Sequence, residues 1–232
     1  MIFAGIVAGG TGTRMGAGMP KQFIEIGGRP IIIRTIERFA SVSAVDIVLT
    51  AIHPDWLVYT QELTKNSLDK EKLKKLRIIP GGSDRNASVF RIIDAAKKLG
   101  GLPDDIILTH DAVRPFVTEE IILNNISCAG NYPACTTAVP ATDTILCSDD
   151  SASVTETPDR SKLYHAQTPQ TFTIGSIENA YSRLNDDQKK QLTDVCGIFT
   201  LSGGTVHIVP GDVSNIKITT PFDLKIAEAL LR

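Results

Sequence analysis

The sequence lacks the features that mark several common classes of protein. No apolar run reaches the roughly 20 residues that a membrane-spanning helix needs, and the opening MIFAGIVAGG has no basic segment of the kind found in secretory signals. Excess charge is also missing, because 24 Lys and Arg residues face 26 Asp and Glu residues, a net charge of −2. Proteins that coat nucleic acids usually carry a basic excess. We therefore expect a cytoplasmic protein without a membrane or nucleic-acid partner, although small phosphorylated ligands need only a few local cations.

Metal-binding and nucleophile patterns are equally scarce. Four cysteines, Cys128, Cys135, Cys147 and Cys196, occur without a C-x-x-C pair, so reduced thiols are expected rather than a disulfide or a metal site. The four histidines show no metal-ligand spacing and no arrangement with Ser, Cys or Asp that indicates a nucleophile. Aromatic residues make up 6% of the chain and are scattered, which argues against a platform for stacking bases.

Short apolar runs alternate with segments of helical periodicity along the 232 residues. The predicted strands are Ile2–Ala8, Asp46–Ile52, Arg77–Pro80, Ile106–His110 and Cys135–Val139. The predicted helices are Pro30–Ser41, Pro54–Asn66, Asp84–Leu99, Thr118–Ala129 and Thr220–Leu231. This alternation is typical of a Rossmann-like α/β domain, expected to span residues 1–232, whose doubly wound, mostly parallel sheet has helices on both faces.

Residues 140–160 interrupt the alternation. The stretches TDTILCS and SVTETPD suggest two short strands around the polar turn Asp149-Asp150-Ser151. A hairpin with so little apolar material is marginal in water by itself. The segment is predicted either to lie on its own domain or to reach a partner chain, and the pattern favours neither.

A glycine-rich stretch, AGGTGTRMG at residues 8–16, follows the first predicted strand and precedes PKQF at residues 20–23. Glycines allow backbone N–H groups to approach a phosphate closely, and Arg14 and Lys21 add positive charge. The dinucleotide pattern G-x-G-x-x-G is excluded because Met15 stands where the third glycine is needed. The P-loop is excluded because neither Ser nor Thr follows Lys21. Polyphosphate binding is the favoured interpretation, against a loop that merely turns the chain.

Two further loops follow predicted strands. The stretch GGSDRNAS at residues 81–88 opens a helix, whose N-terminus offers free N–H groups, although its first polar residues could serve only as a cap. The stretch HDAVRP at residues 110–115 places Asp111 where it could hold a metal or a ribose, and Arg114 where it could hold a phosphate, unless the two merely pair in a turn. Because open α/β sheets bind ligands at the carboxyl ends of their strands, the three loops are expected to converge.

A fourth group of polar residues has no predictable position: Arg160, QTPQ at 167–170, Asp194 and NIK at 215–217. The pattern puts Lys217 on a short strand between apolar neighbours, where a lysine is more often a solvated edge residue than a functional one.

Together these residues resemble a known family. The opening A-G-G-x-G-x-R-M-G with P-K-Q-F is similar to that of the sugar nucleotidyltransferases. The elements G-G-x-x-R-x-x-S, H-D-x-x-R-P, D-R, T-P-Q, T-D and N-I-K-I-T narrow the resemblance to the polyol-phosphate cytidylyltransferases, in the same order and over nearly the whole chain. The resemblance implies a nucleotide-diphospho-sugar transferase fold with a protruding β-arm. It also implies an enzyme that converts CTP and a polyol phosphate to a CDP-polyol and pyrophosphate by in-line attack, without a covalent intermediate.

The resemblance assigns roles to residues of this sequence. The catalytic positive charge would come from Arg14, Lys21 and Lys217. The residues expected to bind CTP are Ala8, Gly9, Gly10, Thr11, Gly12, Gly81, Gly82, Asp84, Arg85, Ser88 and Asp111, where the 81–88 loop reads cytosine and Asp111 holds Mg²⁺ or the ribose. The residues expected to bind the polyol phosphate are Arg114, Thr144, Arg160 and Thr168. Residues 140–160 would form the arm of a homodimer, and Arg160 would reach the partner's site.

Within this family, the sequence is more similar to the enzymes acting on ribitol 5-phosphate than to those acting on 2-C-methyl-D-erythritol 4-phosphate. The opening residues and YHAQTPQTF at 164–172 carry this preference, and Ser83 stands where the methylerythritol enzymes often have an acidic residue. Transfer of CMP to D-ribitol 5-phosphate, for teichoic-acid or capsule precursors, is the predicted function. The methylerythritol reaction of isoprenoid synthesis is the alternative. A catalytically silent nucleotide-binding protein would be expected to lack the cations of the first loop.

Overall fold

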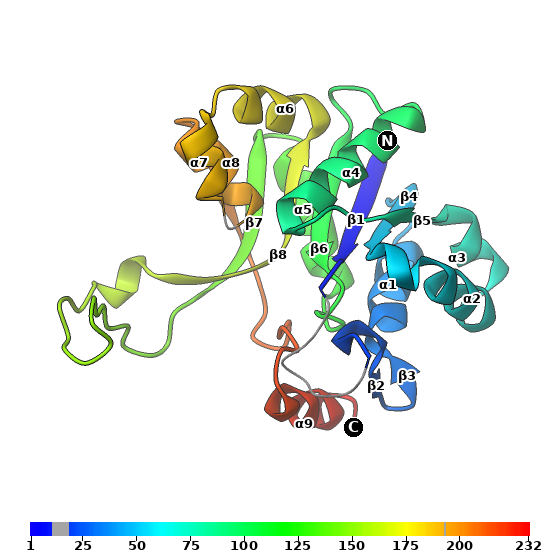
Figure 1. Cartoon of the computed structure of the whole chain (residues 1–232), viewed down its shortest axis with the longest axis horizontal. Coiled ribbons are helices and arrows are strands. Elements are labelled where there is room, and N and C mark those ends of the chain that lie inside the picture. The colour runs from blue at the N-terminus through cyan, green and yellow to red at the C-terminus, as the bar shows by residue number, and fades with distance from the viewer. Residues whose placement is uncertain (11–18, 193) are drawn as a thin grey trace.

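The computed structural model describes residues 1–10, 19–192 and 194–232. Their central element is a seven-stranded sheet in the order β5-β4-β1-β6-β8-β7-β9 (Figure 1). Its strands are β1 (Ile2–Ala8), β4 (Ile47–Ile52), β5 (Leu76–Pro80), β6 (Ile106–Asp111), β7 (Ala134–Pro140), β8 (Tyr164–Thr173) and β9 (His207–Pro210). All neighbouring strands are parallel except at β8, which runs antiparallel to β6 and β7. The predicted mostly parallel α/β sheet is confirmed.

Helices cover both faces of this sheet. The helices of the described residues are α1 (Ile31–Ser41), α2 (Leu57–Ser67), α3 (Lys70–Lys75), α4 (Arg85–Lys98), α5 (Glu119–Ala129), α6 (Ile174–Ser182), α7 (Asp186–Lys190), α8 (Val195–Leu201) and α9 (Pro221–Leu230). A small hairpin of β2 (Glu25–Ile26) and β3 (Arg29–Pro30) precedes α1, and α9 lies beside β2 rather than on the sheet. In the part of the chain that the structure describes, no helix is long and apolar enough to span a membrane.

Alternating side chains of the central strands fill two cores. On one face, Ala4 and Ile6 of β1 share a buried cluster with Phe39 of α1. On the other face, Phe3 of β1 shares a cluster with Ile92 of α4. A strand buried on both faces is apolar throughout, which is why β1 has the bounds that its sequence predicts.

The five strands and five helices predicted from the alternating pattern are present, with bounds that differ by a few residues. Three helix starts follow the capping pattern, because the side chains of Asp84, Thr118 and Thr220 accept hydrogen bonds from backbone N–H groups in the first turns of α4, α5 and α9. The sequence did not predict β8, β9, α3 or the helices α6 to α8.

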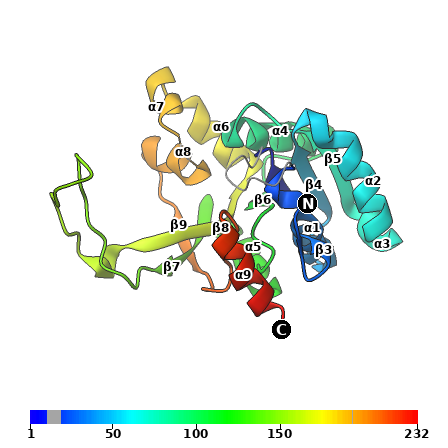
Figure 2. The ribbon, with the colours of Figure 1, turned by 60° about the horizontal axis from the view of Figure 1, so that its bottom comes forward.

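Residues 140–160 protrude from the body of the molecule as an arm between β7 and β8 (Figures 1 and 2). The turn lies where it was predicted, since Ser151 has a φ of 60° and Asp150 accepts N–H bonds from Ala152 and Ser153. The two predicted strands are wrong. A single antiparallel bridge, between Cys147 and Glu156, joins the halves of the arm, which has too little apolar contact to hold a longer ladder.

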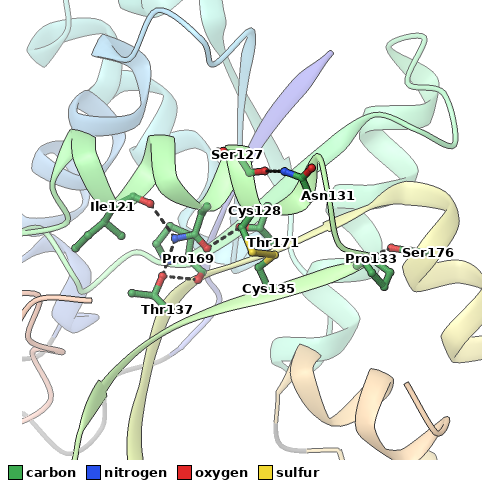
Figure 3. The surroundings of a disulfide bond; sticks show 11 residues. Ile121, Ser127, Cys128, Asn131, Pro133, Cys135, Thr137, Pro169, Thr171 and Ser176 are labelled. Carbon is green, nitrogen blue, oxygen red and sulfur yellow. Dashed lines mark hydrogen bonds between the residues drawn. A yellow bond between two sulfur atoms is a disulfide. The ribbon is translucent and has the colours of Figure 1, made fainter. Parts of the chain in front are cut away.

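A disulfide joins Cys128, in the last turn of α5, to Cys135, near the start of β7 (Figure 3). The expectation of reduced thiols is therefore wrong for this pair, whereas Cys147 and Cys196 are free. The turn after α5 brings the two cysteines together across a sequence separation of 7. Because that spacing is typical of no particular disulfide or metal motif, the sequence alone could not indicate the pairing.

Candidate active site

The carboxyl ends of β1, β4, β5 and β6 open into one cleft of about 680 Å³, a size that suits a small-molecule ligand. Because β1 leads into Gly9 and Gly10, β5 leads into the 81–88 loop and β6 ends at Asp111, the three loops converge as predicted. The cleft is lined by Val7, Ala8, Gly9, Gly10, Lys21, Gln22, His53, Pro54, Gly81, Gly82, Ser83, Asp84, Arg85, Ser88, Asp111, Ala112, Val113 and Lys217.

The cleft brings together most of the residues that the family resemblance assigned to CTP and to catalysis. They are Ala8, Gly9, Gly10, Lys21, Gly81, Gly82, Asp84, Arg85, Ser88, Asp111 and Lys217. Three more, Thr11, Gly12 and Arg14, lie outside the described residues. The four residues assigned to the polyol phosphate are not in the lining of the cleft.

Gln22 supports the first loop from inside the protein. Its buried amide donates hydrogen bonds to the carbonyl oxygens of Ala8 (2.9 Å) and Gly10 (3.2 Å). Gly9, between them, lies against α4, since a Cβ there would come within 3.5 Å of Ser88 Oγ. No role for Gln22 could be predicted from the sequence, because hydrogen bonds from a side chain to distant carbonyl oxygens produce no periodic pattern.

The second loop packs too tightly for a side chain at Gly82, where a Cβ would lie 2.4 Å from the Ala87 Cβ and 2.6 Å from its carbonyl carbon. Asp84 is the cap of α4, because it accepts a hydrogen bond from Ala87 N (2.8 Å). The Ser88 hydroxyl donates to Asp84 O (2.8 Å) and accepts from Gly82 N (3.0 Å). With its hydrogen already used, Ser88 can only accept from a ligand, and an exocyclic amino group such as that of cytosine donates.

Three positive side chains surround the buried Asp111 carboxylate. Lys217 Nζ lies 2.7 Å from Oδ2, Arg85 Nε lies 3.3 Å from Oδ1 and Arg114 Nε lies 3.9 Å from Oδ2. Burial of the carboxyl opposes ionisation, but attraction to Arg85 and Lys217 outweighs it and holds the pKa of Asp111 well below its usual range. Asp111 is therefore an anion at neutral pH, and the cations around it outnumber it.

Lys217 is the residue for which the local sequence pattern was wrong. It lies on an irregular segment rather than on a strand, and its ammonium pairs with Asp111 instead of being only solvated. Its side chain lines the cleft and is still 42% exposed, so it can reach a ligand. The family element N-I-K-I-T was the one sequence signal that pointed to it.

Behind Asp111, the fully buried His110 connects the turn at residues 111–114 to β8. Its Nε2 lies 3.0 Å from Arg114 O, and its Nδ1 lies 2.9 Å from Thr168 Oγ1. Burial lowers the pKa of the His110 imidazole to about 4, so the ring is neutral at pH 7. Thr168 itself is 4% exposed, and its hydroxyl also accepts a hydrogen bond from Asp111 N (3.3 Å). This hydroxyl therefore bonds within the protein.

Arg114 lies beside the cleft with its guanidinium directed to backbone groups. Nη1 donates to Asn215 O (2.7 Å), and Nη2 makes a longer contact with Ala166 O (3.4 Å). These bonds tie the turn after β6 to β8 and to the segment that carries Lys217. The structure thus places Arg114 within reach of Asp111 but gives its fork-shaped head other partners.

Gln170 and Asp194, two residues whose positions the sequence could not predict, join Arg85 in a chain of contacts. Arg85 Nη2 donates to Gln170 Oε1 (3.2 Å), and Gln170 Nε2 donates to Asp194 Oδ2 (2.7 Å). The other oxygen of Asp194 accepts from Gly197 N (2.9 Å) and so caps α8. The chain fixes Arg85 against Asp111.

Thr144 and Arg160 are both exposed on the arm, and neither lines the cleft of its own chain. Arg160 Nη1 donates to Thr142 O (2.8 Å), a bond within the arm. The structure of one chain therefore does not bring these two residues to the site.

Within the described ranges, no three His, Cys, Asp or Glu side chains gather in a way that could hold a metal ion. The carboxylates in the cleft lining are Asp84, which caps α4, and Asp111. A single carboxylate suits Mg²⁺, which usually keeps water and substrate phosphates as its other ligands.

Known proteins similar to this chain are cytidylyltransferases and 4-diphosphocytidyl-2C-methyl-D-erythritol synthases. Residues 2–232 match the family model for IspD, 2-C-methyl-D-erythritol 4-phosphate cytidylyltransferase. A ribitol-5-phosphate cytidylyltransferase of Streptococcus pneumoniae is 45% identical over 233 residues, which cover 100% of this chain and 99% of that protein.

Solved structures resemble the fold over its whole length. The 4-diphosphocytidyl-2C-methyl-D-erythritol synthase from Anaerococcus prevotii has a TM-score of 0.83 and 31% identity, covering 100% of this chain and 96% of that one. The 2-C-methyl-D-erythritol 4-phosphate cytidylyltransferase from Thermus thermophilus has a TM-score of 0.74 and 28% identity, covering 99% and 98%.

Proposed function

Because the chain belongs to the 2-C-methyl-D-erythritol 4-phosphate cytidylyltransferase (IspD) family, we propose that it transfers CMP from CTP to D-ribitol 5-phosphate, giving CDP-ribitol and pyrophosphate. The observation that carries the choice of acceptor is the 45% identity to the ribitol-5-phosphate enzyme of Streptococcus pneumoniae, over nearly all of both chains. Identity to the Anaerococcus methylerythritol synthase is 31%. The proposed enzyme is cytoplasmic, and its product serves teichoic-acid or capsule synthesis.

In the proposed reaction, a phosphate oxygen of ribitol 5-phosphate bonds to the α-phosphorus of CTP. The bond between the α-phosphorus and the bridging oxygen breaks, and pyrophosphate leaves with that electron pair. The protein has to position two anions and stabilise charge that grows on the α-phosphate and on the leaving group. Lys21 and Lys217, which line the cleft, supply the positive charge that stabilises these phosphates, together with Arg14.

The loops suggest how CTP lies in the cleft. The backbone after β1, at Gly9 and Gly10, would face the triphosphate, and the 81–88 loop would face the base. Ser88 can accept a hydrogen bond from the cytosine amino group, as its bonding pattern requires. Lys217, exposed at the side of Asp111, would turn to the reacting phosphates.

Asp111 fits a divalent metal, because its carboxylate is ionised and lines the cleft. We propose Mg²⁺ as the cofactor, which when bound would neutralise charge on the triphosphate. A chelator should then stop pyrophosphate release, and added Mg²⁺ should restore it. Full activity in the chelator would contradict this role of Asp111.

We also propose that the chain forms one domain, residues 1–232, and that residues 140–160 are a dimerisation arm. Leu146 and Val154 on the arm are more than half exposed, at 56% and 58%, which suits contact with a second chain. Arg160 and Thr144 would then act in the polyol-phosphate site of the partner, and Arg114 in that of its own chain, whereas the Thr168 hydroxyl bonds His110 and Asp111 N.

The purified enzyme should be assayed for pyrophosphate release with CTP and each polyol phosphate. Ribitol 5-phosphate should give a kcat/KM at least about tenfold above that of 2-C-methyl-D-erythritol 4-phosphate, a difference that a few altered contacts can produce. A higher value for the methylerythritol substrate, which the family description favours, would replace the proposed acceptor. No pyrophosphate release with either would refute cytidylyl transfer.

A further inference from the structure

The turn after β6, residues 111–114, carries the Asp111 carboxylate into the cleft, and His110 directly precedes it. Both ring nitrogens of His110 contact polar atoms associated with this turn: Nε2 reaches Arg114 O at 3.0 Å, and Nδ1 reaches Thr168 Oγ1 at 2.9 Å. Thr168 Oγ1 in turn accepts from Asp111 N at 3.3 Å. The ring therefore connects the backbone at the two ends of the turn.

The direction of each hydrogen bond follows from the groups involved. A carbonyl oxygen can only accept, so His110 Nε2 carries a hydrogen and donates to Arg114 O. Thr168 Oγ1 accepts from the Asp111 amide, and its single hydrogen is donated to Nδ1 of the neutral ring. The atoms from Arg114 O through the His110 ring and Thr168 Oγ1 to Asp111 N form a relay. Each donor and acceptor in this relay has a partner, and reversing the hydrogen bonds would leave at least one of them without a partner.

The surroundings keep the ring and the turn from moving. His110 has no exposed surface, and its ring centroid lies 4.9 Å from that of Phe39. Thr35 of α1 donates to Ala112 O (2.9 Å) in the middle of the turn. The turn is thus held at its centre by α1 and at both ends by His110 and Thr168.

We propose that His110 is a positioning residue for the reaction, which with Thr168 holds the turn so that the Asp111 carboxylate stays between Arg85 and Lys217. The proposal rests on the proposed function and assigns the Thr168 hydroxyl to the protein framework rather than to the substrate. Small displacements of charged groups in a site that works by positioning cost large factors in rate.

Thr168→Val removes the hydroxyl with little change of shape, and Thr168→Ser retains it. Thr171→Val is a matched control, because Thr171 lies on the same strand, is fully buried and donates to Asn125 (3.1 Å) outside the cleft. Thr168→Val should lower kcat about tenfold or more, with both KM values changed less than about threefold. Thr168→Ser should restore the rate, and Thr171→Val should keep it although its Tm falls.

A Thr168→Val enzyme with unchanged kcat and a raised KM for the polyol phosphate would overturn the proposal, since Thr168 would then contact substrate. Equal loss of kcat in Thr171→Val would also overturn it. His110→Gln keeps a donor for Arg114 O, and His110→Asn keeps an acceptor for Thr168, so each retains half of the relay. Both should lose kcat, and a full rate in either variant would overturn the proposed restraint, because the contact that the variant lacks would then be dispensable.

Amide hydrogen exchange separates this proposal from the proposed function. In Thr168→Val the Asp111 amide should exchange faster than in wild type or Thr168→Ser, whatever reaction the enzyme catalyses. An unchanged exchange rate would overturn the proposed restraint even if cytidylyl transfer is confirmed. Faster exchange in an enzyme that releases no pyrophosphate would leave the restraint standing and refute only the function.

Discussion

Two inactive variants of this protein should regain activity when they are mixed. Lys21→Ala removes a cation from the cleft, and Arg160→Ala removes one from the arm, where the Arg160 side chain donates to Thr142 O. The arm protrudes from the body (Figure 2). If it completes the site of a partner, Lys21 and Arg160 of a single site come from different chains.

The expected magnitude follows from this arrangement. Random exchange of equal amounts makes half of the dimers mixed. In each mixed dimer one site carries both defects and the other carries neither, so about a quarter of all sites are intact and about a quarter of wild-type activity should return. If Arg160 instead served its own chain, every site of a mixed dimer would carry one defect, and nothing would return.

Pyrophosphate release before and after mixing is the assay, with native mass spectrometry as the check that subunits exchange. Mixing each variant with itself is the control for dilution and handling. Confirmed exchange without recovered activity would refute the shared site. A wild-type protein that sediments as a fully active monomer would refute the dimer as well.

Three further predictions test the cleft and the core behind it. Lys21→Ala should lower kcat about a hundredfold or more while CTP binding weakens less, because its charge matters most in the transition state; steady-state turnover within a few-fold of wild type would remove it from catalysis. Gly82→Ala should raise the KM for CTP, because its Cβ would meet the Ala87 carbonyl carbon at 2.6 Å, and an unchanged KM would separate this loop from the nucleotide. The contribution of His110 to the free energy of unfolding should fall by about 3 kcal/mol between pH 6.5 and about pH 4, because over that range unfolded His110 binds a proton that the folded ring refuses, whereas folded Asp111 stays charged. Urea titrations should show this slope in wild type and lose it in His110→Gln; equal slopes would refute the assignment to His110.

The elements that the sequence predicted share one property, which is that their own residues carry the signal. The apolar run of β1 reflects burial on both faces, and Asp84, Thr118 and Thr220 each cap a helix within a few residues of themselves. The convergence of three loops could be predicted because parallel strands end at the same edge of a sheet.

Strand β8 was missed because its burial depends on distant partners. Its buried residues include Gln167, Thr168, Gln170 and Thr171, which read as polar loop, and Pro169 argues against a strand. These side chains are buried because groups far along the chain satisfy them, such as Asn215 for Gln167 and Asp194 for Gln170. Hydrophobic periodicity does not detect a strand of this kind.

The site divides in the same way. The local pattern predicted Asp111, because it ends an apolar strand. It did not predict a role for Lys217, whose partner lies 106 positions earlier and whose neighbours are apolar, and only the family element N-I-K-I-T pointed to that residue. Gln22 and His110 are likewise defined by the backbone groups that they hold. Contacts between residues that are far apart in the sequence can be identified only when the fold is known.

The whole chain is weakly negative, whereas positive side chains outnumber the carboxylate at Asp111. This difference explains why the ligand is a small anion rather than a long one. A net charge of −2 disfavours a long polyanion that contacts much of the surface. A triphosphate meets only the cleft, where Arg85 and Lys217 pair with Asp111 and Arg114 lies beside them. The single carboxylate keeps these cations from repelling one another apart without neutralising them. The remaining positive charge is therefore held in place before a nucleotide arrives, which is the arrangement that a reaction catalysed by position and charge requires.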